Sequence, residues 1–320
     1  MRRTCGVLVA GLSIGVVACG DDGSSSPEQM LRVDGVAGPI VELDGAVWVL
    51  AGEMVVEFDT TTREVVRKID MGTEYSGALA SDGEVLWVTG VYGLKRIDPA
   101  TGAVITTDLG YHSLATAAGR LFASRDGNLY ELDPATGDEL SEVTLPPNQN
   151  GFNNEVVQMP LVAVGDRLWV TVAEDDFSFT AFDPATGTFG AKVEVDEAFG
   201  SAVLVADVIW LADRYGNFTV ADAITGEPLD TTAELPVGET ILDSTGSLFV
   251  GPDGTLWLLD QPAQNVYQLD PRTGATLASF HLTERPSAMV VTANDLWITN
   301  GFDDKITVLP RSAMKPVVPA

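Results

Sequence analysis

Apolar and polar positions alternate along most of this chain, in short segments separated by turn residues. Such alternation predicts half-buried β-strands rather than helices. One phrase recurs seven times at intervals of 35 to 47 residues: a small loop, an aliphatic residue, a large aromatic residue and an aliphatic run. The aromatic anchors of the copies are Trp48, Trp87, Phe122, Trp169, Trp210, Trp257 and Trp297.

A second phrase, an aliphatic strand that ends in Asp before a Thr-Gly-type turn, follows six of the anchors. Asp can cap such a turn, a following Pro presets φ, and Gly adopts the left-handed conformation that closes a hairpin. We expect these aspartates to be turn caps and not a metal array, because each lies in a hairpin of its own. Four of them precede Pro and two stand in less regular copies; they are Asp98, Asp133, Asp183, Asp270, Asp59 and Asp222.

A repeat of about 40 residues built from four short strands is typical of β-propeller blades. The sequence therefore predicts an all-β, seven-bladed β-propeller, in which each large aromatic side chain fills the wedge between neighbouring sheets. The last copy has three strands, so we expect residues 31–34 to supply its outer strand and close the ring. The predicted blades are 38–69, 78–107, 114–143, 160–193, 201–231, 246–280 and 288–309.

The first residues are typical of a targeting signal rather than of a folded domain. Arg2 and Arg3 precede a 14-residue apolar stretch that is too short to span a bilayer and ends in Val-Val-Ala-Cys. This ending resembles the lipobox of bacterial lipoproteins, and the resemblance implies a lipid on Cys19. We expect a signal peptide over residues 1–18, a flexible tether over 19–30, the propeller over 31–310 and a loose tail over 311–320. Because Cys5 would be removed, the mature chain would contain no disulfide.

The net charge of −28 disfavours binding to the phosphate backbone of nucleic acids and polybasic contact with a membrane. Its simplest explanation is solubility outside the cytoplasm, although a cationic ligand, a metal ion or a basic protein would also suit it. We expect a monomer in the bacterial cell envelope, with membrane contact through the lipid alone and an envelope protein, a peptide or a carbohydrate as its ligand.

The LWV of residues 86–88 and the IDPATG of residues 97–102 resemble extracytoplasmic propellers with YVTN-type repeats. Residues 251–274 resemble a repeat of the streptogramin B lyase-like propellers. The latter resemblance implies a His base and acidic metal ligands at the channel mouth. The chain contains only His112 and His281, and neither stands in a matching pattern, so no catalytic residue is assigned. Quinoprotein dehydrogenase repeats usually have a Trp shortly after the Thr-Gly, which is absent here.

A ligand site in such a ring is expected where the loops between second and third strands meet the connections from one blade to the next. His112, in such a connection, is a weak candidate for a catalytic base. The insert 146–160 is longer than a normal connection and could cover the channel mouth. The residues expected at the mouth are Tyr75, Tyr92, His112, Arg125, Asp213, Arg214, Tyr215, Asp260, Arg285 and Asn300.

Two acidic pairs in equivalent loops could offer oxygen ligands to Ca²⁺ or Mg²⁺; they are Asp175 with Asp176, and Asp303 with Asp304. Otherwise the sequence predicts no cofactor. The leading hypothesis is a lipid-anchored binding or scaffold module. The alternative is a metal-assisted enzyme of the lyase or lactonase type with its site at the channel mouth.

Overall fold

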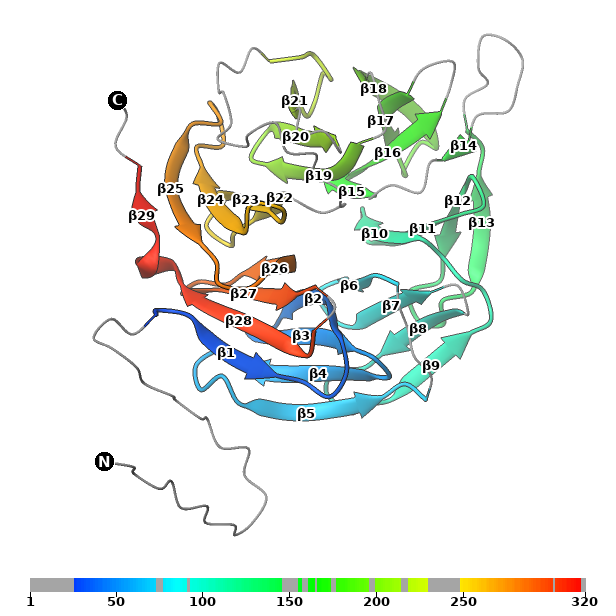
Figure 1. Ribbon diagram of the computed structural model, residues 1–320. Helices are drawn as coiled ribbons and strands as arrows, with labels where there is room; N and C mark the ends of the chain where they lie inside the picture. The colour runs from blue at the N-terminus through cyan, green and yellow to red at the C-terminus, as the bar shows by residue number, and fades with distance from the viewer. Residues whose placement is uncertain are drawn as a thin grey trace, which may run out of the picture.

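The computed structural model describes residues 26–72, 77–90, 93–145, 155–156, 161–164, 166–173, 177–195, 199–213, 218–229, 248–301 and 303–317. Seven antiparallel sheets surround a common centre (Figure 1). Over the described residues the only helical segment is the short 3₁₀ turn η1 (Arg311–Ala313), and no helix could cross a membrane. The predicted seven-bladed propeller is confirmed.

Each blade is a meander that runs outward from the centre, with sequential strands paired. The inner strands are β2 (Ala37–Leu43), β6 (Leu79–Ser81), β10 (Ser113–Ala117), β15 (Val162–Val164), β19 (Phe199–Val205), β22 (Leu248–Val250) and β26 (Pro286–Val291). The second strands, which hold the anchors, are β3 (Ala46–Ala51), β7 (Leu86–Gly90), β11 (Arg120–Arg125), β16 (Arg167–Ala173), β20 (Val208–Asp213), β23 (Leu256–Asp260) and β27 (Asp295–Asn300).

The outer half of each blade is less uniform. The third strands are β4 (Met54–Asp59), β8 (Gly93–Ile97), β12 (Asn128–Leu132), β17 (Phe177–Asp183), β21 (Phe218–Asp222), β24 (Asn265–Leu269) and β28 (Lys305–Pro310). The outer strands are β5 (Val65–Asp70), β9 (Val104–Thr107), β13 (Glu139–Val143), β18 (Thr188–Val195), β25 (Thr276–His281) and, for blade seven, β1 (Gln29–Arg32). The described part of blade five has three strands and a single bridge between Ala221 and Pro228.

The aromatic anchors join each blade to the next, as predicted. Trp48 of blade one packs with Leu86 and Val88 of blade two, and Trp297 of blade seven packs with Val47 and Val49 of blade one, so the series closes on itself. No anchor exposes more than 2% of its surface. Burying one indole is worth roughly 4–6 kcal/mol by area, an upper bound. Seven equivalent wedges therefore hold the ring together without a disulfide.

The two ends of the propeller meet in blade seven. Strand β1 pairs with β28 and supplies the missing outer strand, which confirms the predicted closure (Figure 1). The pairing begins at Gln29 and includes Met30, so these two residues belong to the ring and not to the predicted tether. Arg63 of blade one reaches across the seam: its guanidinium donates to Asp295 Oδ1 at 2.9 Å and to Gln29 Oε1 at 2.5 Å.

The six aspartates of the second phrase cap their own turns. In each, Oδ1 accepts a hydrogen bond from the backbone N–H two residues later. Five turns then use Gly at positive φ, whereas the first has Arg63 at φ 61° in that place. The rim that holds these turns is called the turn rim below. The turn-cap prediction is confirmed.

Two predicted boundaries are wrong. The tail is not loose over its first residues, because β29 (Lys315–Pro316) pairs with β25 and adds a fifth strand to blade six (Figure 1). Blade four does not begin at residue 160 either. Strand β14 (Glu155–Val156) pairs with one end of β16 and β15 pairs with the other, so the inner strand starts within the insert 146–160 and is interrupted. Other residues of the insert lie outside the described ranges.

Candidate functional site

The rim opposite the turn rim contains the loops between second and third strands and the connections that enter each blade; it is called the mouth rim below. Antiparallel pairing places these two kinds of loop side by side. The His112 N–H donates to Ser124 O at 2.9 Å, and the Gly301 N–H donates to Arg285 O at 3.1 Å. The predicted meeting of the two loop sets is therefore observed in blades three and seven.

Half of the predicted mouth residues can be placed with their side chains. Of Asp213, the structure describes the backbone at the end of β20 and not the side chain. Four more lie outside the described residues: Tyr75, Tyr92, Arg214 and Tyr215. The remaining five, which differ in burial and in partners, are His112, Arg125, Asp260, Arg285 and Asn300.

His112 and Arg285 are the accessible members of the described set. Both are exposed, and their side chains make no hydrogen bond or ion pair. His112 lies in the connection between blades two and three, and Arg285 in the connection between blades six and seven. An unpaired cation and a free imidazole at a loop rim can bind a partner without first breaking an internal contact.

Arg125 is committed to its own blade. Its guanidinium lies 4.6 Å from the ring centroid of Tyr130 and 5.2 Å from that of Tyr111, and it forms an ion pair of 2.5 Å with Glu139. Burial and the Glu139 carboxylate, which accepts a hydrogen bond from the Tyr111 hydroxyl, raise the Tyr111 pKa. The two tyrosines and the carboxylate hold the arginine in place.

Asp260 and Asn300 are buried to 1% and 2% exposure and have internal partners. Asp260 Oδ1 accepts the backbone N–H of Ala263 at 3.0 Å and caps the loop of blade six. The Asn300 amide donates to Thr307 Oγ1 at 3.2 Å and contacts the Met30 sulfur, which ties β27 to the closing strand β1. The five described residues therefore do not converge on one ligand site.

The described acidic pair is occupied by cations of the chain itself. Asp303 forms an ion pair with Lys305 at 2.7 Å, and Asp304 forms one with Arg32 at 2.6 Å. The Lys305 ammonium, helped by the Asp304 N–H, lowers the Asp303 pKa to about 2. No cluster of His, Cys, Asp or Glu suited to a metal occurs in the described ranges, and Asp175 and Asp176 lie outside them. A metal ion at Asp303 would have to displace an ammonium group.

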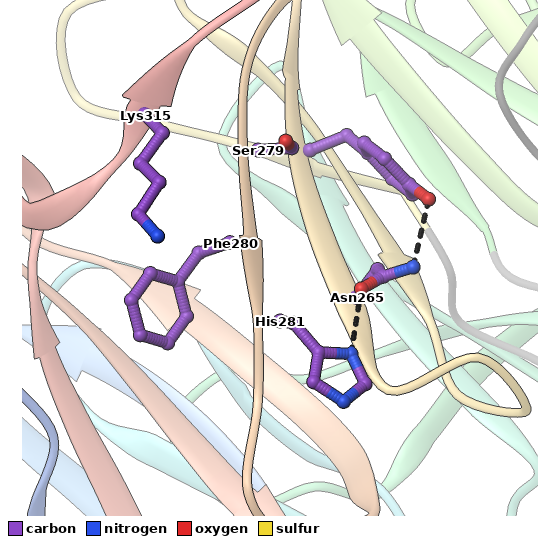
Figure 2. A pocket seen from close by; sticks show the side chains of 6 residues that line it. Asn265, Ser279, Phe280, His281 and Lys315 are labelled. Atoms are coloured by element: carbon purple, nitrogen blue, oxygen red, sulfur yellow. Dashed lines mark hydrogen bonds between the residues drawn. The ribbon is translucent and has the colours of Figure 1, made fainter. Parts of the chain in front are cut away.

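A pocket of about 320 Å³ lies on the outer half of blade six and reaches the mouth rim, where β24 begins at Asn265 and β25 ends at His281. Figure 2 shows the lining residues on β24, β25 and β29, with the side chains of Lys315 and Phe280 on the other side of β25 from those of Asn265 and His281. Sequence reasoning missed this pocket. One signal could have found it: the capped turn at Asp270 sets the hairpin register, and that register puts Asn265 opposite His281. The lining residues are Asn265, Tyr267, Ser279, Phe280, His281 and Lys315.

The sequence matches a family model described as outer membrane protein assembly factor BamB, over residues 80–253 and again over 125–297. Each match covers more than half of the chain. The chain belongs to this family. The two overlapping matches are offset along the repeats, and together they run from blade two to blade seven. No curated protein matches the sequence significantly.

Solved structures similar to this member of the family confirm the fold. Virginiamycin B lyase from Staphylococcus aureus aligns with a TM-score of 0.69 and 14% identity, over 88% of this chain and 98% of that one. BamB from Moraxella catarrhalis aligns with a TM-score of 0.57 and 14% identity, over the same shares. Hydrazine synthase from Kuenenia stuttgartiensis aligns with a TM-score of 0.65 and 13% identity, over 88% and 97%. The resemblance to lyase-like propellers is thus confirmed for the architecture, and at these identities for the architecture alone.

Proposed function

We propose that this protein is a protein-binding propeller of the bacterial cell envelope that recognises its partner with the mouth rim. Membership of the BamB family carries the proposal, since the family's namesake is an outer membrane protein assembly factor. The exposed and unpaired Arg285 on this rim supports it, because arginine is frequent among the residues that dominate binding at interfaces.

Arg272 offers a matched control for Arg285. Its side chain is also exposed and makes no hydrogen bond or ion pair. It lies in blade six, in the turn that Asp270 caps, and therefore on the turn rim. A photo-crosslinking amino acid at position 285 should capture an envelope protein in cells, whereas the same amino acid at 272 should not. Equal capture from both positions, or capture from 272 alone, would overturn the assignment to the mouth rim.

The proposal includes an anchor at Cys19, since the lipobox-like ending and polar linker suit acylation. Replacing Cys19 with Ser should move the protein from the membrane fraction to the soluble fraction, because an acylated cysteine would be its only attachment. Cys5→Ser is the control and should leave the protein membrane-bound. A Cys19→Ser protein that stays in the membrane fraction would refute lipid anchoring while leaving the protein-binding role open to its own test.

A lyase or lactonase-type activity is the second candidate, favoured by the free and exposed imidazole of His112 on the mouth rim. If the protein has such an activity, an added divalent metal should support turnover. His112→Ala should abolish that turnover, whereas the control His281→Ala should not. Purified protein that neither retains nor responds to a divalent metal would refute this candidate.

A further inference from the structure

Blade three holds an ion pair at its junction with blade four. Arg120 stands two residues before the anchor Phe122, and Glu131 lies opposite that anchor on the next strand. The Arg120 Nε donates to Glu131 Oε1 at 2.6 Å, and its Nη2 donates to Oε2 of the same carboxylate. Ser141 donates a further hydrogen bond to Oε2 at 3.2 Å. The remaining nitrogen of the guanidinium, Nη1, donates to Pro184 O in the capped turn of blade four. One arginine therefore binds a carboxylate of its own blade and a carbonyl of the next.

Blade four repeats this arginine without its carboxylate. Arg167 stands two residues before the anchor Trp169, and its Nη1 donates to Ile224 O in the capped turn of blade five at 3.4 Å. The residue opposite Trp169 is Ala181, where blade three has its glutamate. Arg167 thus reaches toward the next blade as its counterpart does. Its Nε and Nη2, the two nitrogens that hold the carboxylate in blade three, make no hydrogen bond or ion pair with any residue that the structure describes.

A pocket of about 330 Å³ opens in blade four where blade three has the glutamate. The outer strands of both blades carry a register shift after the capped turn, so their residues can be matched. Beside Ala181, Ala191 takes the place of Ser141. Gly190 takes the place of Leu140, and a Cβ on this glycine would have no atom within 4 Å. The arginine and all three shortened residues line the pocket.

The opposite wall of the pocket belongs to the capped turn of blade five and is packed tightly on blade four. A Cβ on Gly226 of that turn would lie only 2.8 Å from Lys192 O of β18, so the turn rests directly on the strand. Asp183 also lines the pocket, but its Oδ1 accepts backbone N–H groups of its own turn. Its charge opposes more than one added negative charge nearby. The guanidinium of Arg167 therefore remains available to a ligand that carries a single negative charge.

We propose that this pocket binds a ligand carboxylate on a short alkyl stem, held by Nε and Nη2 of Arg167 as Glu131 is held in blade three. Two parallel hydrogen bonds from a guanidinium to a carboxylate are among the stronger polar contacts, and the planar fork selects a planar anion. A free organic acid and the acidic side chain of a peptide share this chemistry. The site lies beside the turn rim and does not depend on the partner proposed for the mouth rim.

The test adds propionate at constant ionic strength and follows the Nε–H signal of Arg167 by NMR. The signal that disappears in Arg167→Gln assigns it. Propionate should shift this signal saturably, whereas propionamide, which has the same shape without the charge, should not. A tripeptide with a central glutamate and blocked ends separates the two sources of the carboxylate. Tighter binding of the peptide than of propionate would support the proposal with a peptide side chain as the ligand, and weaker binding would support it with a free organic acid.

Variants that rebuild the arrangement of blade three inside blade four are the sharpest check. Ala181→Glu should supply the missing carboxylate, pair with Arg167 and abolish propionate binding without lowering the melting temperature. Ala191→Ser restores the neighbouring hydroxyl and leaves the pocket open, so it should tighten binding several-fold. Arg272→Gln removes an exposed cation from the turn rim of blade six and should change nothing.

A second readout covers the variant that lacks the arginine. The backbone amide signal of Gly190, which lies in the pocket, should respond to propionate in the wild type, and in Arg167→Gln the affinity should fall at least about tenfold. A shift that never saturates, an equal response to propionamide, or undiminished binding in Ala181→Glu would overturn the proposal. If Ala181→Glu does not fold, undiminished binding in Arg167→Gln would overturn it equally.

Discussion

On the turn rim, six aspartates each accept hydrogen bonds from the backbone of the turn that they begin, and five of these turns are completed by glycine. Among the mouth-rim residues that the structure describes, no such pattern recurs. There Arg125 lies over the rings of two tyrosines, Asn300 secures the closing strand, and His112 and Arg285 are free. The repeat encodes what every blade needs in order to fold. The proposed recognition of a partner needs only a few side chains, so we expect it where the copies differ.

The largest expected effect comes from removing a wedge, on which both rims depend. Trp297 is fully buried between blades seven and one, and its indole N–H has no hydrogen-bond partner, so its contribution is packing. Trp297→Ala should reduce the free energy of unfolding by about 3–5 kcal/mol, measured by urea denaturation.

Trp297→Phe is the matched control for this change. It keeps a ring close to Phe58, which lies 5.7 Å from the indole, and should cost clearly less. If alanine and phenylalanine cost the same, the seam is not closed by this wedge, and the two rims would not share one rigid ring.

The second prediction compares an ion pair of each rim. The Arg63–Asp295 pair on the turn rim is 22% and 7% exposed, whereas the Arg32–Asp304 pair on the mouth rim is 62% and 37% exposed. A double-mutant cycle to alanine should give a coupling energy of about 2 kcal/mol for the first pair and roughly 0–1 kcal/mol for the second. Equal coupling energies would show that Arg63 does not hold the seam together. The presence of Arg63 where the other five turns have glycine would then need another explanation.

The architecture could be predicted from the sequence because it depends on local and repeated features. An anchor such as Trp87 has to be large and flat in every copy, and Asp98 bonds to residues two and three positions away. Pairings between distant segments leave no such signal. Lys315 stands beside a proline and has the composition of a loose tail, yet it pairs with β25. Arg125 was predicted as a mouth residue, but its role depends on Glu139, in the outer strand of its blade.

The third prediction concerns a single turn cap. Asp270 Oδ1 accepts the N–H groups of Arg272 and Thr273 at 2.9 and 2.8 Å, and these bonds, that of Thr273 foremost, lower the Asp270 pKa. Asp270→Ala should cost about 1 kcal/mol at neutral pH. Because the folded pKa is the lower one, this stability is fully present above the unfolded value of about 3.9 and is lost as the pH falls through the folded pKa.

The unfolding free energies of the wild type and of Asp270→Ala should therefore converge in acid. Asp270→Asn keeps an acceptor oxygen without a titrating proton, so its difference from Asp270→Ala should not change with pH. A difference between wild type and Asp270→Ala that persists unchanged to low pH would mean that the charge of the cap contributes nothing.

The smallest effect is expected on the mouth rim, where Asp303 has a pKa of about 2, chiefly because of the Lys305 ammonium. Lys305→Gln should raise this pKa toward the ordinary value of about 3.9 with little change in melting temperature, since the Asp303 side chain is 38% exposed and water screens the pair. Carbon-13 NMR of the side-chain carboxyls can follow the titration. Arg32→Gln is the control, because Arg32 pairs with Asp304 and not with Asp303. An Asp303 pKa that stays near 2 in Lys305→Gln would assign the lowering to the Asp304 N–H, which donates to Asp303 Oδ1 at 2.7 Å. The acidic loop would then be organised by its own backbone, like the aspartates of the turn rim.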